Sequence, residues 1–188
     1  PTVQSMEPQQ LRRVDGHHEQ APVMVYDTVV QGCNLGDSWE QLDATLDNVR
    51  AAYLEVFQRV QMSEASTALL QVLMAAEEPP SSFMLQQMGI EEADIHQLPG
   101  WGTLFYESEH RIYLLHKFLS DWLLMSDNPF KPDVEAGHRR LGMAAVKEVQ
   151  ERCGGSTPLP DYTSKYGVFH LCHGGPLCLQ LLDMVLAD

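Results

Sequence analysis

Residues 39–60 read WEQLDATLDNVRAAYLEVFQRV, and the spacing of their apolar side chains decides the fold class. These apolar residues recur at alternating intervals of three and four, the period of an amphipathic α-helix; they are Trp39, Leu42, Leu46, Val49, Tyr53, Val56 and Val60. Ser38 and Gln41 stand three residues apart at the start, as in a capping box that satisfies free amide groups. We therefore predict a helix here. The apolar residues of this helix also fit a heptad pattern for about three repeats, so the helix could pair with another copy of the chain.

The same periodic pattern continues along the chain, interrupted by residues that end helices. Pro79-Pro80, Pro99-Gly100 and Gly154-Gly155 each follow an apolar periodic stretch and are expected to end a helix. The sequence thus predicts a mainly α protein, a single-domain helical bundle of about six helices. The further helices are predicted over residues 64–78, 81–89, 90–98, 107–125, 133–153 and 176–186, with a loop over 156–167.

The first part of the chain lacks this pattern. Residues 1–22 are polar and aperiodic, so we interpret them as an N-terminal arm. Residues 23–30, VMVYDTVV, are rich in β-branched side chains and could form one short strand, although a single strand needs a partner. The helical domain is accordingly expected to span residues 23–188.

Composition and charge narrow the classes of function. The 188 residues include 26 acidic and 12 basic side chains, so the formal net charge is −14 and the pI about 4.8. Such a charge repels phosphate backbones, and we expect no direct binding of nucleic acid. No apolar run approaches the roughly 20 residues that span a bilayer, and no signal-peptide pattern stands at the start. We therefore expect no membrane association and an intracellular, cytoplasmic location.

The four cysteines are Cys33, Cys153, Cys172 and Cys178. They form no CxxC pair, and four cysteines in a chain of this length are not a disulfide scaffold. We interpret them as free thiols, although a secreted protein with two disulfides fits the same count.

Two Glu-x-x-His spacings form the first candidate site: Glu107 with His110, and Glu135 with His138. On a helix, side chains three residues apart project from neighbouring faces and can ligate one metal ion, as in helical di-iron and di-manganese proteins. Here, however, the two motifs fall on consecutive predicted helices, whereas the helices that carry them in those proteins alternate with others. Two interpretations stay open: an iron or manganese site, or ordinary surface and core residues.

The second candidate site is a dense group near the C-terminus: His170, Cys172, His173 and Cys178. Imidazole and thiolate are the ligands that zinc and copper prefer, and the Gly-Gly-Pro turn between these residues could bring them together. The spacing matches no common zinc pattern, and a buried histidine beside buried thiols is the commoner arrangement. Alternatively, Cys178 could be a reactive thiol, because a helix dipole lowers the pKa of a thiol in the first turn.

Aromatic side chains suggest a third kind of site. Trp39, Tyr53, Trp101, Phe105 and Trp122 could line a groove between helices, where bundles commonly hold ligands. The sequence contains no P-loop, dinucleotide fingerprint, nucleophile elbow or HExxH motif.

Our leading hypothesis is therefore a non-catalytic helical interaction protein, such as an accessory subunit, chaperone or regulator. It would bind a protein partner or a small apolar ligand through its helix seam or an interhelical groove. The alternatives are a metal-dependent oxidoreductase of the di-iron or di-manganese type and an acidic mimic of nucleic acid.

Overall fold

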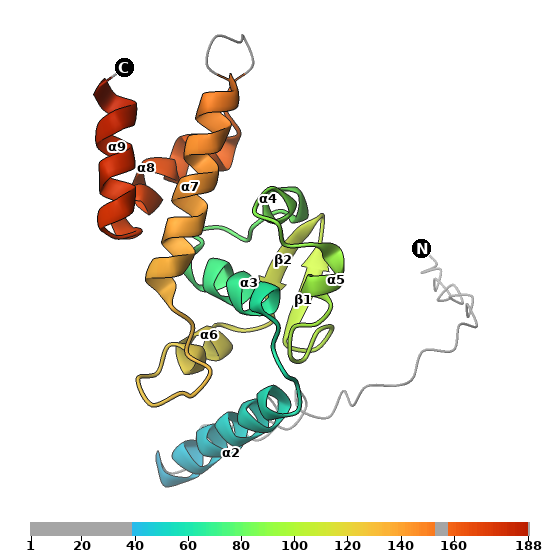
Figure 1. Ribbon diagram of the computed structural model, residues 1–188. Coiled ribbons are helices and arrows are strands. Elements are labelled where there is room, and N and C mark those ends of the chain that lie inside the picture. The colour runs from blue at the N-terminus through green and yellow to red at the C-terminus, as the bar shows by residue number, and fades with distance from the viewer. Residues whose placement is uncertain (1–38, 153–157, 188) are drawn as a thin grey trace, which may run out of the picture. The chain divides into compact units, whose positions relative to one another are not determined.

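The computed structural model describes residues 39–152 and 158–187, with side chains over 44–152 and 158–183. Within these ranges the chain forms eight helices and one two-stranded antiparallel sheet (Figure 1), which confirms the mainly α class. The chain divides into two units, residues 1–42 and residues 43–188, and the contacts described below belong to the second. The predicted arm and short strand lie outside the described residues.

Helix α2 spans Trp39–Gln58 and confirms the first predicted helix. In the second unit its apolar face enters the core through Tyr53 and Phe57, which are both buried. Phe57 lies off the predicted stripe, whereas Val56 and Val60 of that stripe are only half-buried. Tyr53 and Phe57 stand four residues apart and therefore project from the same side of the helix.

Helix α3 spans Glu64–Ala75, and short helices follow it as predicted. Its N-cap is Ser63, whose Oγ accepts a hydrogen bond from the Ser66 N–H at 3.0 Å. Helix α4 (Ser82–Gln87) is capped in the same way by Ser81. Helix α5 (Glu92–Ile95) begins with a capping box. Local capping chemistry thus sets the start of each of these helices.

The helix predicted over residues 107–125 is wrong in its first half. Strand β1 (Phe105–Ser108) and strand β2 (Arg111–Leu114) form an antiparallel hairpin there. The two residues that join them, Glu109 and His110, have positive φ angles of 50° and 58°. Positive φ at both positions is the geometry of a tight two-residue hairpin turn.

Only the second half of that stretch is helical, as α6 (Lys117–Leu123). Its N-cap is His116, whose Nδ1 accepts a hydrogen bond from the Phe118 N–H at 3.0 Å. Leu119 and Leu123, one turn apart, enter the core, as does Ile112 from β2. The apolar residues before His116 therefore repeat with the period of a strand, and those after it repeat with the period of a helix. A single helical period applied to the whole stretch does not distinguish the two.

Helix α7 spans Val134–Arg152, close to its predicted bounds, and begins where the Asp133 carboxylate accepts the Ala136 N–H at 3.0 Å. It packs along α3 (Figure 1). Gly137 permits this approach, because a Cβ at this position would lie 2.1 Å from the carbonyl oxygen of Gln71. The backbones of the two helices are therefore in direct contact.

Helix α8 spans Asp161–His173 and occupies much of the stretch that we predicted as a loop. It packs against α7, and helix α9 (Pro176–Ala187), which the sequence did predict, packs against both. The apolar periodicity of α8 is weak, so its stability depends on tertiary contact. Gly142 of α7 provides that contact, since its backbone lies against Leu171.

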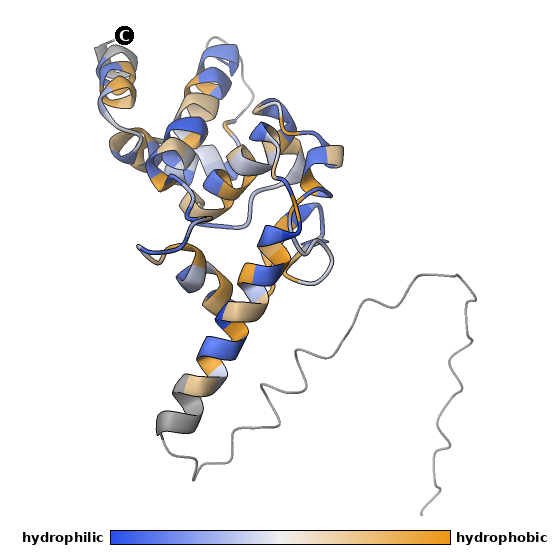
Figure 2. Ribbon diagram, turned by 60° about the horizontal axis from the view of Figure 1, so that its bottom comes forward, coloured by the Kyte–Doolittle hydropathy of each residue, from blue (hydrophilic) through white to orange (hydrophobic). Residues whose placement is uncertain are grey.

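The main core of residues 43–188 gathers aromatic and aliphatic side chains from α2 to α7. The Phe57 ring lies 5.2 Å from the Trp122 ring and 5.4 Å from the Phe130 ring. A smaller cluster joins Val146, Leu171 and Cys178 between the last three helices. Hydrophobic and hydrophilic segments alternate along the helices (Figure 2), as expected when each helix buries one face. None of the described helices is both long and apolar enough to cross a membrane.

Candidate functional site

A groove lies between the end of α3, the Pro79-Pro80 segment, strand β2 and helix α6. Its volume is about 360 Å³, within the roughly 300–1,000 Å³ of typical ligand sites. Leu124 lines it and remains 40% exposed, so apolar surface faces solvent. Most of the lining is apolar: Leu73, Met74, Ala76, Pro79, Pro80, Ile112, Tyr113, Leu114 and Leu124, with Glu77, Glu78, His116, Lys117 and Ser120.

The charges in this groove are concentrated where α3 ends. Glu77 and Glu78 line that part of the groove, and Lys117 lines the part formed by α6. Lys117 pairs with Asp121 at 3.8 Å, and Glu78 pairs with Lys165 at 3.6 Å. Among the described residues, no lysine or arginine pairs with the exposed Glu77. The groove therefore combines apolar surface with an uncompensated carboxylate.

A polar network joins α7 to α8. His138 of α7 and His170 of α8 face each other with their Nδ1 atoms 2.8 Å apart. His170 is 0% exposed, and its Nε2 lies 2.9 Å from the hydroxyl of Tyr162. On the other side, the ring of the exposed His173 lies 5.4 Å from the His138 ring. His138, His170 and Tyr162 thus form one chain of polar contacts between α7 and α8.

The direction of these hydrogen bonds follows from the number of protons available. Two neutral Nδ1 atoms in contact share one proton, so one ring donates and the other accepts. If His170 donates from Nδ1, its Nε2 can accept the Tyr162 O–H. The opposite direction leaves the Tyr162 proton without an acceptor among the described residues. We therefore assign the Nδ1–H tautomer to His170 and the Nε2–H tautomer to His138.

The surroundings of the network favour its uncharged state. Burial, with smaller contributions from the charges of His138 and His173, lowers the pKa of His170 to about 4. Burial also lowers the pKa of His138, which His173 lowers further and Glu77 raises. Burial raises the pKa of Tyr162 to about 12. At neutral pH the two rings and the phenol are therefore neutral.

A small cavity of about 10 Å³ adjoins His170 between α7 and α8. Its polar lining consists of Glu148, Tyr162, Thr163 and His170. Glu148 is buried, and its carboxylate accepts a hydrogen bond from the Thr163 hydroxyl.

Glu78 joins the groove to helix α8. Glu78 lines the groove and accepts a hydrogen bond from the Tyr166 hydroxyl at 2.8 Å. Helix α8 therefore holds the acidic wall of the groove in position.

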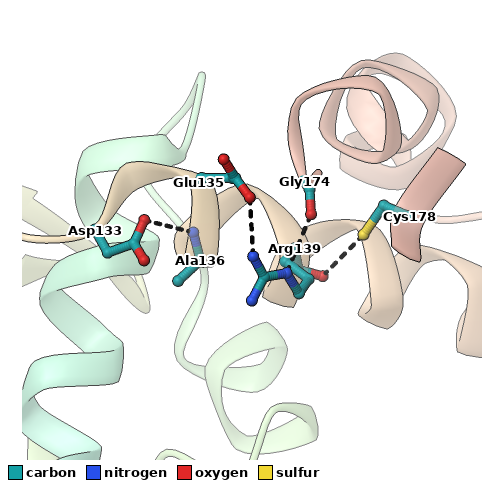
Figure 3. Close-up of polar contacts among 6 residues, drawn as sticks. All are labelled: Asp133, Glu135, Ala136, Arg139, Gly174 and Cys178. Atoms are coloured by element: carbon teal, nitrogen blue, oxygen red, sulfur yellow. Dashed lines mark hydrogen bonds and ion pairs between the residues drawn. The ribbon is translucent and has the colours of Figure 1, made fainter. Parts of the chain in front are cut away.

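The structure separates the two Glu-x-x-His pairs that the sequence suggested as an iron or manganese site. Glu107 and His110 lie on the hairpin rather than on a helix, and they pair with each other at 3.7 Å. Glu135 accepts a hydrogen bond from Arg139 at 3.0 Å (Figure 3), while His138 faces the histidine network. Within residues 39–152 and 158–187, no group of three or more His, Cys, Asp or Glu side chains is placed to hold a metal ion. The four residues therefore do not come together.

The C-terminal group of histidines and cysteines is also divided. His170 is buried, whereas Cys172 and His173 are exposed on α8. Cys178 is buried against α7, where its thiol approaches the Arg139 carbonyl oxygen at 4.0 Å (Figure 3). Burial raises the pKa of the Cys178 thiol, contrary to the expectation of an activated thiol in the first turn of α9. The other two cysteines lie outside the described residues.

The aromatic residues predicted to line a groove mostly fill the core instead. Tyr53, Phe105 and Trp122 are buried, and the Tyr53 and Trp122 rings lie 5.4 Å apart. Trp101 is half-buried against the ring of His96 at 5.2 Å. The side chain of Trp39 lies outside the described residues. The observed groove is therefore lined by other residues.

Sequence reasoning misses both the groove and the role of Tyr162. The one local signal of the groove is Pro79-Pro80, which ends α3 and places an extended segment beside β2, where the Ile112 N–H donates to the Pro80 oxygen at 3.0 Å. The His138–His170 contact joins positions 32 residues apart, so no local pattern indicates it. Tyr162 falls in the stretch that we predicted as a loop.

Comparisons of the chain with protein-family models, curated proteins and solved structures find no match. The function is therefore argued from the groove and from the network beside it.

Proposed function

We propose that this protein is a non-catalytic interaction protein that binds a segment of a protein partner in the groove between α3, β2 and α6. The observation that carries the proposal is the groove itself, which has a volume of about 360 Å³, apolar residues in most of its lining and carboxylates at one end. Partially exposed apolar surface in such a groove favours association, because covering it removes it from water.

The charges of the chain specify the chemistry of the partner segment. Glu77 is exposed in the groove without a described basic partner, and the chain as a whole carries a formal charge of −14. A segment that combines apolar side chains with lysine or arginine would fill the groove and pair with Glu77. The overall negative field would also accelerate its approach.

The test uses selection of a partner segment from a random library. The full chain is immobilised, 12-residue peptides are selected by display, and the strongest binders are synthesised and measured by fluorescence anisotropy. We expect peptides enriched in Leu, Ile, Lys and Arg. Leu124→Lys places a charge in the apolar part of the groove and should weaken binding by at least about tenfold.

A matched control variant is Phe83→Lys, which makes the same kind of change at a 63% exposed position that does not line the groove. It should bind the selected peptides like the unmodified protein. Peptides that bind Leu124→Lys as tightly as the unmodified chain would place the binding surface elsewhere. If no peptide is selected but the neutral dye Nile red binds in the groove, the groove binds a small apolar ligand rather than a protein partner.

A further inference from the structure

Strand β2 has one edge on β1 and the other edge on the groove. Its residues Ile112, Tyr113 and Leu114 all line the groove. Just past the strand, the Leu115 N–H donates to the Leu104 oxygen at 2.9 Å, which fixes the bonded positions of the hairpin register. Bonded and non-bonded pairs alternate along an antiparallel ladder. The N–H and C=O of Leu114 therefore point away from β1, toward the groove.

The chain itself occupies only the first part of this groove edge. The Ile112 N–H donates to the Pro80 oxygen at 3.0 Å, and Pro80 has no N–H with which to return the bond. The same register, continued by two residues, would place Glu78 opposite Leu114. In the part of the chain that the structure describes, no hydrogen bond joins the backbones of these two residues. The pairing along β2 therefore ends at Pro80.

Beyond Pro80 the groove edge of β2 is open over Leu114 and His116. His116 continues the extended backbone, with φ −149° and ψ 145°, and it lines the groove. Its N–H lies on the same side of the chain as that of Leu114, because alternate residues of an extended chain are equivalent. Across residues 39–152 and 158–187, neither N–H donates a hydrogen bond and the Leu114 oxygen accepts none. Free donors and acceptors on a strand edge are a template for another strand.

We propose that the partner segment binds in the groove as an extended strand, which pairs with the open edge of β2 at Leu114 and His116. This inference rests on the proposed function of the groove and adds the conformation of the segment. Every second side chain of an extended segment faces the same way. The side chains that fill the groove should therefore recur at intervals of two residues, whereas a helical segment would place them at intervals of three and four.

The charges at the groove select among extended segments. Glu77 is exposed at the end of α3, and Lys117 of α6 is already paired with Asp121 at 3.8 Å. A lysine or arginine of the segment is attracted to Glu77, whereas the formal charge of −14 repels an acidic segment. Main-chain bonds to β2 supply affinity for an extended segment, and the carboxylate supplies the preference for a basic one.

The first experiment needs no partner and measures hydrogen exchange of the backbone amides by NMR. The N–H groups of Ile112, Tyr113 and Leu115 are bonded within the fold. The Leu114 amide has no acceptor, so it should exchange at least about tenfold faster than these three neighbours. A Leu114 amide as protected as its neighbours would mean that the edge is already paired, and this result overturns the inference.

The second experiment replaces each backbone amide of a selected groove peptide in turn by its N-methyl form. Alternate N–H groups of a strand face β2, so methylation at every second position should weaken binding about tenfold or more. The positions between them are the matched controls, where affinity should change by less than about threefold. Only the peptide is altered, so the fold of the chain is not perturbed. Equal losses at every position, as a helical peptide would give, or no loss at any position, overturn the strand.

Two further readouts separate the strand from the groove itself. Bound peptide should slow exchange of the Leu114 amide at least about tenfold, and the selected sequences should repeat their apolar and basic residues with a period of two. Peptides that bind with a period of three or four, or that leave the Leu114 amide unprotected, refute the strand and leave the proposed function standing. If no peptide binds, the proposed function fails and the strand with it.

Discussion

Substitution of Gly137 by alanine should destabilise the fold by pushing α3 and α7 apart. The added Cβ would lie 2.1 Å from the Gln71 carbonyl oxygen, 0.9 Å closer than the 3.0 Å below which such contacts are essentially never found. The obstructing atom belongs to the backbone, so no rotamer change relieves the clash. Overpacking of this kind costs about 1–3 kcal/mol, against a gain of up to about 1 kcal/mol in helix propensity. We expect a net loss of about 1 kcal/mol.

Urea unfolding followed by tryptophan fluorescence measures this loss, and thermal unfolding should show a melting temperature lower by about 2–4 °C. Met143→Ala is the matched control on the same helix, because Met143 is 48% exposed. Its stability should stay within about 0.5 kcal/mol of the unmodified chain. A Gly137→Ala protein as stable as the original, or more stable, would refute the close contact of α3 with α7.

Three further predictions follow from the buried and strained residues. Because folding lowers the pKa of His170 from 6.5 to about 4, the unfolded chain binds more protons between these values, and stability should fall as the pH drops through this range. Urea titrations at several pH values should show that roughly 2–3 kcal/mol of this loss of stability comes from His170. An equal loss of stability in the His170→Gln variant would contradict this assignment. Glu109→Asn combined with His110→Gly should raise the free energy of unfolding by about 1–2 kcal/mol, since both positions have positive φ, and an unchanged urea midpoint would count against the hairpin turn. A maleimide should label Cys172 in the native protein and Cys178 only after unfolding, as peptide mass mapping would show.

Helices with local signals were predictable because those signals act within a few residues. Ser63 and Ser81 cap helices by bonding amides three residues ahead, and Pro79 and Pro80 cannot continue α3. The predicted bounds of α7 and α9 differ from the observed ones by a residue at most at either end.

The hairpin and α8 were not predictable on the same basis. Glu109 and His110 lack the Asn-Gly signal of a two-residue turn, and their positive φ angles persist because Phe105 and Ile112 are buried on either side of the turn. Helix α8 has a weak apolar period and is held by contact of its Leu171 with α7.

The sequence by itself determined the helical class, most helix boundaries and the acidic character of the chain, because composition, capping and apolar period are local properties. Only the tertiary structure decided the candidate site. Packing of α8 on α7 brings His138 to His170, a contact across 32 positions, and separates His138 from the glutamate and histidine of the hairpin. Helix α8 also places the Tyr166 hydroxyl on the Glu78 carboxylate at the groove. Contacts of this kind depend on the approach of two backbones, which no local spacing of residues specifies.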